Sequence, residues 1–172
     1  MLSPRMEEAL NKQINAELHS AYIYLAMAAD LEEKNLPGAS SWMKMQVQEE
    51  LMHARKFFDY INERQGRVTL EAIEAPPGSW ESILAIFEAA YKHEVYISGR
   101  INDLVELSRE EKDNATYNFL QWFVSEQVEE ESSTDAVVQK LKLVGDHGHG
   151  IFMVNQELGA RVFTPPAAET GV

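Results

Sequence analysis

The chain has 172 residues, with 28 Asp and Glu against 15 Lys and Arg for a net charge of -13, and it contains no cysteine. Its length and 45% hydrophobic content fit one globular domain. Without cysteine, a disulfide scaffold, an iron–sulfur cluster, a thiolate zinc finger and a cysteine nucleophile are excluded. Any bound metal must therefore have carboxylate, imidazole or amide ligands.

The sequence also argues against two classes of partner. Excess acid repels nucleic acid phosphate, and no Lys/Arg stripe offsets it. The opening MLSPRMEEAL lacks a basic segment followed by an apolar run, and no stretch approaches the roughly 20 apolar residues of a membrane span. We therefore expect a cytoplasmic protein that binds neither nucleic acid nor a membrane.

Sparse glycine and proline separate long segments of helical periodicity, which predicts an all-α fold. The first helix should begin after Ser3-Pro4 and end near Glu33, and its expected apolar stripe is Leu10, Ile14, Ala21, Leu25 and Ala28. Three more long helices are expected over 40–64, from Ser79 or Ser82 to 112, and over 114–144, the last capped by Asp113. A shorter fifth helix is expected over 150–161.

Loop lengths indicate how these helices are connected. The first and third links are short and can join only antiparallel neighbours. The second link has about 14 residues, which reach about 46 Å when extended, against about 40 Å for a helix of about 27 residues. We expect a four-helix bundle over residues 1–163 with a long crossover between helices two and three and a short fifth helix, followed by a flexible tail over 164–172.

Each long helix carries polar residues where its apolar stripe requires a hydrophobic one. These residues are Glu17, Glu50, Glu94, Gln127 and Glu130. Each lies about 10 to 17 residues from the start of its helix, so a rise of about 1.5 Å per residue places them near one level of the bundle. His53 follows Glu50 by three residues and shares its face.

Four carboxylates in an apolar interior would repel one another and lose their hydration. No Lys or Arg occurs in the stripes, whereas two divalent cations would balance the four charges. Oxygen and imidazole ligands suit Fe(II), Mn(II) or Zn(II), and the pattern is that of carboxylate-bridged dinuclear bundles. Taken singly, each Glu is more typical of a solvated surface and the His of a satisfied core group. Their coincidence at one height favours the metal site.

The sequence resembles the non-haem ferritins of bacteria and archaea over residues 3 to 163. The resemblance lies in Asn15-Ala16-Glu17-Leu18, Tyr22-Ile23-Tyr24, Gln48-Glu49-Glu50-Leu51-Met52-His53, Tyr91-Lys92-His93-Glu94, Asn118-Phe119-Leu120-Gln121-Trp122-Phe123 and Glu126-Gln127-Val128-Glu129-Glu130-Glu131. It implies an iron-storage protein that oxidises Fe(II) with dioxygen or peroxide. It also implies a homo-oligomeric shell of 24 subunits that holds ferric mineral.

The resemblance further implies a ligand set with two to three irons per subunit. The first iron site would be Glu17, Glu50 and His53, and the second Glu50, Glu94 and Glu130 with Gln127 close by. The third site would use the acids Glu49, Glu126, Glu129 and Glu130. Tyr24 matches the tyrosine that the family places beside the centre, where it would donate an electron or only pack.

The sequence also bears on several other functions. Haem is not expected, because Leu51 follows Glu50 where bacterioferritins carry a methionine, and helix four lacks a second Glu-x-x-His. A rubrerythrin-type peroxidase would need cysteines. A structural or assembly bundle with an inactive centre would keep some carboxylates protonated. In the turn before the fifth helix, His147 and His149 are expected to cap it, or else to bind metal at a pore.

Overall fold

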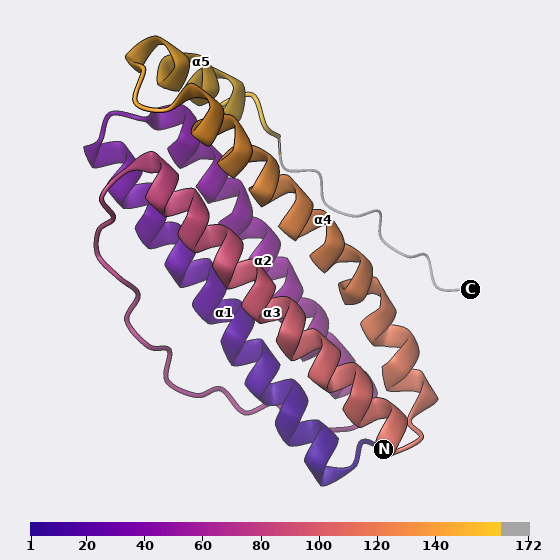
Figure 1. The fold of residues 1–172 in the computed structure, drawn as a ribbon. Helices are drawn as coiled ribbons and strands as arrows, with labels where there is room; N and C mark the ends of the chain where they lie inside the picture. The colour runs from indigo at the N-terminus through magenta and orange to yellow at the C-terminus, as the bar shows by residue number, and fades with distance from the viewer. Residues whose placement is uncertain (163–172) are drawn as a thin grey trace.

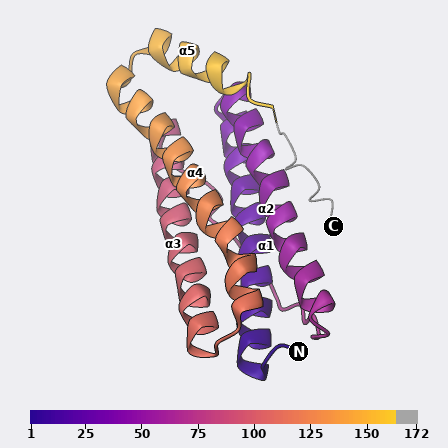
Figure 2. The same ribbon diagram turned by 90° about the vertical axis from the view of Figure 1, so that its right-hand side faces the viewer.

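The structure, a computed structural model, describes residues 1–162, and these form five α-helices and no strand. The helices are α1 (Pro4–Glu33), α2 (Pro37–Glu63), α3 (Ile83–Glu110), α4 (Asn114–Val144) and α5 (Gly148–Leu158). The first four lie side by side, and α5 lies across one end of the bundle (Figures 1 and 2). The expected tail, 164–172, lies outside the described residues.

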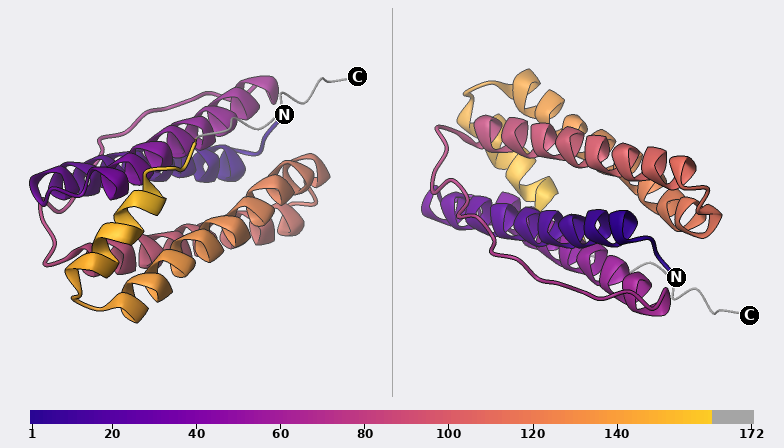
Figure 3. Two further views of the ribbon diagram at one scale, coloured as in Figure 1. Left: turned by 90° about the horizontal axis from the view of Figure 1, so that it is seen from above. Right: turned by 90° about the horizontal axis from the view of Figure 1, so that it is seen from below.

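The expected bundle topology is confirmed. Helices α1 and α2 form one antiparallel hairpin and α3 and α4 form another, while α2 and α3 run in the same direction (Figure 1). The connecting segment, 64–82, therefore runs the length of the bundle beside α1 (Figure 3). Asn11 of α1 accepts a hydrogen bond from the Thr69 amide (2.7 Å), and Asp30 accepts one from the Trp80 amide (3.1 Å). Polar side chains of α1 thus hold the crossover in place.

Helices α2 and α5 differ from their expected bounds, and for α3 the structure distinguishes between two expected starts. Helix α2 begins at Pro37 rather than near Ser40, because proline fits the first turn of a helix, where its missing N–H has no partner to lose. Of the two expected starts for α3, Ser82 is its N-cap, accepting a hydrogen bond from the Ala85 amide (3.1 Å). Helix α5 covers 148–158 rather than 150–161, and the side chain of its N-cap residue, His147, makes no capping hydrogen bond.

The buried apolar residues form two clusters rather than one continuous core. One cluster, at the α5 end, includes Met27, Met43 and Phe87. The other, at the opposite end, includes Leu10, Phe57 and Phe123. In all four long helices, polar residues occupy the stretch between the two clusters, so the bundle has a polar layer in the middle of its length.

The prediction that Leu25 belongs to the buried stripe of α1 is wrong. Leu25 is 50% exposed, whereas Tyr24, Met27, Ala28 and Leu31 are buried. A 3.6-residue period starting from Ile14 and Glu17 reaches Tyr24 two turns later and leaves Leu25 at the edge of the buried face.

None of the described helices combines the length and the apolar character needed to cross a lipid bilayer.

Helix α5 is joined closely to the start of α2. The α2 N-cap residue, Leu36, has no capping side chain, and Asn155 of α5 instead accepts a hydrogen bond from the Ala39 amide (2.9 Å). Gly38 allows this approach, because a Cβ at that position would lie 1.8 Å from the Asn155 carbonyl oxygen. The capping bond and the glycine together fix the position of α5 on the bundle.

Candidate metal centre

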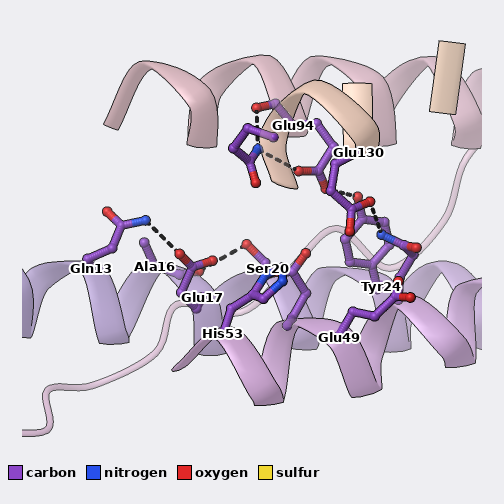
Figure 4. A network of polar contacts seen from close by, with 12 residues as sticks. Gln13, Ala16, Glu17, Ser20, Tyr24, Glu49, His53, Glu94 and Glu130 are labelled. Carbon is purple, nitrogen blue, oxygen red and sulfur yellow. Dashed lines mark hydrogen bonds and ion pairs between the residues drawn. The ribbon is translucent and has the colours of Figure 1, made fainter. Parts of the chain in front are cut away.

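The polar layer contains side chains from all four long helices. Glu17 comes from α1, Glu50 and His53 from α2, and Glu94 from α3, and α4 adds Gln127 and Glu130. The exposure of these six residues is 5% or less, so the structure brings the inner predicted set into one buried layer. Figure 4 shows Glu17 and His53 of the first hairpin opposite Glu94 and Glu130 of the second.

Hydrogen bonds from neutral groups hold three of the four inner carboxylates. Gln13 donates to Glu17 Oε1 (2.8 Å) and Gln127 to Glu94 Oε2 (3.1 Å), and the hydroxyl of Tyr24 donates to Glu94 Oε1. Gln46 donates to Glu130 Oε2 (2.8 Å). Among the described residues, no Lys or Arg donates to any of the four, so their charges are not balanced by a bonded cation.

Three buried polar atoms of the described residues have no hydrogen-bond partner: Glu17 Oε2, Glu50 Oε2 and His53 Nε2. Glu17, Glu50 and His53 each offer a ligand atom, and these atoms lie within 4.8 Å of one another. A second group of the same compactness comprises His53, Glu126 and Glu130. Unpartnered buried donors and acceptors are costly, and a cation bound by them would remove that cost. The donor set therefore fits a hard or borderline divalent metal.

The pKa values follow from burial and from the crowding of like charges. Burial raises the pKa of Glu17 from 4.5 to about 7 and that of Glu130 to about 8. The pKa of Glu50 is raised well above its usual value, first by burial and then by the charges of Glu94 and Glu17. Burial lowers the pKa of His53 to about 3, so its imidazole is neutral and able to bind a metal. The layer thus favours bound protons or bound cations over free charges.

The predicted outer acids lie less deep than the inner set. Glu49 and Glu126 are partly buried, and Glu129 is exposed. Burial raises the pKa of Glu49 and of Glu126, and Glu129 raises both further. The compact ligand groups include Glu126 but neither Glu49 nor Glu129, and Glu49 instead accepts a hydrogen bond from Arg161 (2.8 Å).

Sequence reasoning missed the residues that hold these carboxylates. Gln13 and Gln46 are both buried, and each lies four residues before a predicted ligand, one helical turn away on the same face. This repeated four-residue spacing is the signal in the sequence that could have predicted them. A further hydrogen bond joins Ser20 Oγ to His93 Nε2 (2.7 Å), next in sequence to Glu94. Arg161 had no signal, because its contacts depend on where α5 is docked.

Comparisons with known proteins agree with this architecture. The family model that describes the ferritin-like domain matches residues 7–144 of this chain. A bacterial non-heme ferritin of Campylobacter jejuni is 42% identical over 156 residues, which cover 91% of this chain and 93% of that protein. One of Bacteroides fragilis is 40% identical over 161 residues, covering 94% and 100%.

A crystal structure described as a novel open pore ferritin, from Archaeoglobus fulgidus, has a TM-score of 0.93 and 53% identity, covering 94% of this chain and 100% of that one. The resemblance expected from the sequence motifs is therefore confirmed by sequence relatives and by a solved structure. With its four-helix bundle, its central layer of carboxylates and its match to the family model over most of its length, the chain belongs to the ferritin family.

Proposed function

We propose that this chain is the subunit of an iron-storage protein that oxidises Fe(II) within its own bundle. The observation that carries the proposal is the buried layer of four carboxylates and one neutral imidazole, which has three unpartnered atoms and no bonded cation among the described residues. Iron storage also agrees with the non-heme ferritin relatives. Fe(II) is the substrate, and the carboxylates are its ligands.

In this proposal two Fe(II) ions bind at the layer. Glu17, Glu50 and His53 hold the first, while Glu50 also bridges to the second, which Glu94 and Glu130 hold with Gln127 beside them. Each Fe(II) loses one electron. The two electrons, with two protons from solvent, reduce dioxygen to hydrogen peroxide, or hydrogen peroxide to two water molecules. Anionic oxygen ligands stabilise Fe(III) relative to Fe(II), because the more highly charged ion gains more from them.

The surrounding residues control the geometry of this centre. The hydroxyl of Tyr24 donates to Glu94, and the amide of Gln127 holds the other oxygen of the same carboxylate. These bonds place Glu94 before a second ion arrives. Glu49, Glu126 and Glu129, together with Glu130, would form a third position from which ions exchange with the inner pair.

We also propose that the chain assembles into a homo-oligomeric shell of 24 subunits in the cytoplasm and stores the ferric product as mineral inside it. A groove on the outer side of the α1–α2 hairpin supports burial against another subunit. It is lined by Leu18, Leu51, Phe58 and Leu70, the last three of which are 42 to 65% exposed. Apolar surface of this kind is typical of subunit contacts.

The test is an anaerobic Fe(II) titration of the metal-free protein, followed by oxygen and a record of the ferric absorbance. We expect fast oxidation that saturates at about two to three irons per chain, two at the dinuclear site and one at the third position. Glu50→Gln should abolish it, because the shared ligand is lost while the side-chain volume is kept. The matched control is Glu63→Gln, at an exposed position of the same helix.

Equal, slow oxidation in all three proteins would contradict the proposal. The chain would then be the alternative, a structural or assembly bundle whose central acids are held by protons and hydrogen bonds.

A further inference from the structure

Arg161, three residues beyond α5, reaches the edge of the polar layer on the side of Glu49 and Glu130, while Arg100 bonds Gln13 (3.0 Å) on the side of Glu17. Its guanidinium lies over the ring of Trp42, 4.5 Å from the ring centre, and the side chain is 26% exposed. Trp42 itself is buried in α2, one helical turn before Gln46. The guanidinium is therefore held against the bundle.

The two terminal nitrogens of Arg161 bond different residues of α2. Nη2 donates to Glu49 Oε2 (2.8 Å), and Nη1 donates to Gln46 Oε1. An arginine only donates hydrogen bonds, so it fixes the Gln46 amide with its oxygen toward the guanidinium and its nitrogen toward the layer. That nitrogen donates to Glu130 Oε2 (2.8 Å). The guanidinium thus contacts the outer acid Glu49 directly and reaches the inner acid Glu130 through the Gln46 amide.

The bond to Glu49 uses the same carboxylate that a third metal ion would use. Glu49 and Glu126 lie near Glu129, and Lys56 lies near Glu126. A metal that binds Glu49 through Oε2 must displace the guanidinium, and a metal that binds through Oε1 must share the carboxylate with that positive charge. Displacement costs a charge-assisted hydrogen bond, which is among the stronger polar contacts in proteins.

We propose that Arg161 is a positioning residue that acts as the built-in counter-cation of the outer site: it holds Glu49 until a third ion displaces it. This inference rests on the proposed function. Its effect is to keep the third position weaker than the inner pair, so that an ion there exchanges readily. The docking of α5 through Gly38 and Asn155 fixes the arginine at this place.

Zn²⁺ is a suitable probe, because it binds carboxylate and imidazole ligands and is not oxidised. Isothermal titration of the assembled, metal-free protein should show two tightly bound ions per chain and a weaker third in the wild type. In Arg161→Ala the third ion should bind about tenfold more tightly, the effect expected from removing one charge-assisted hydrogen bond. Arg67→Ala, at an exposed position of the crossover, makes the same charge change and should match the wild type.

Two further measurements separate this role from a structural one. Arg161→Lys keeps the charge but cannot bond Gln46 and Glu49 together, so its third ion should bind with intermediate affinity. The fluorescence of Trp42 should change in the wild type as the third ion binds and its guanidinium leaves, and Trp42→Phe should remove that change. If Arg161→Ala does not assemble, Arg161→Gln provides the same test with a neutral side chain.

Unchanged or weaker third-ion binding in Arg161→Ala would overturn the inference, and so would a third ion that leaves the Trp42 fluorescence constant. Either result with a normal inner pair would leave the proposed function intact. A wild type that fails to bind even the inner pair would instead refute the proposed function itself.

Discussion

Replacing Glu17 by Gln should stabilise the metal-free protein while it weakens metal binding. Glu17 is 1% exposed, and its Oε2 has no partner. The rise of its pKa from 4.5 to about 7 corresponds to about 3 kcal/mol of penalty for the ionised form in the folded state. Gln keeps an oxygen for the bond from Gln13, carries no charge, and can donate toward the carboxylates of the layer.

The pH dependence gives the sign of this effect. Because the folded pKa is raised, the folded protein binds more protons than the unfolded chain between pH 4.5 and about 7, and its stability falls as the pH rises through that range. The penalty is therefore fully present at pH 8 and small near pH 4.5. We expect Glu17→Gln to stabilise the metal-free protein by up to about 3 kcal/mol at pH 8 and by little at pH 5.

Differential scanning calorimetry can measure the melting temperature of the metal-free and of the Zn²⁺-loaded protein. At pH 8, each kcal/mol should raise the melting temperature by about 2 to 4 °C in a chain of this length. With saturating Zn²⁺ the order should reverse, because the variant has lost a ligand and the metal stabilises it less. Glu63→Gln is the control. A metal-free Glu17→Gln protein that melts below the wild type at pH 8 would refute the argument that these acids are kept at a cost for binding metal.

Two further predictions concern the supports of the centre. Tyr24→Phe removes the hydroxyl that bonds Glu94, so we expect stopped-flow ferric formation to slow while Fe(II) still binds, with a stability loss of about 1 to 2 kcal/mol; an unchanged rate would show that the bond does not position Glu94. Asn155→Ala should cost about 1 kcal/mol, the value of a helix cap, and should speed amide exchange in α5, with Gly38→Ala acting more strongly because of its clash with the Asn155 carbonyl. Unaltered exchange in both variants would contradict the account of how α5 is attached.

Much of the fold could be predicted because the hydrophobic pattern and its interruptions are both local signals. A single stripe interrupted by Glu17 in α1 or by Glu94 in α3 already indicates the face and the height of the layer. Four such interruptions then restrict the packing of the helices, since each carboxylate must meet the others. The inner set accordingly lies together in the structure.

What could not be predicted depends on contacts between distant segments. Arg161 lies 112 residues from Glu49 in sequence, and its place depends on α5 ending at Leu158 and on the close approach at Gly38. The exposure of a residue at the edge of an apolar stripe is equally hard to predict. Leu25 is exposed although it follows the buried Tyr24, because successive side chains of a helix point about 100° apart around its axis.

The division of the layer between the two hairpins has a consequence for how the chain folds. The α1–α2 hairpin carries Glu17, Glu50 and His53, and the α3–α4 hairpin carries Glu94, Gln127 and Glu130. Each hairpin forms through contacts between residues near in sequence, whereas the full set of acids meets only when the hairpins dock. Proton or cation uptake therefore belongs to the docking of the two hairpins, and in the metal-free chain this docking becomes less favourable as the pH rises through the raised pKa values of the central acids.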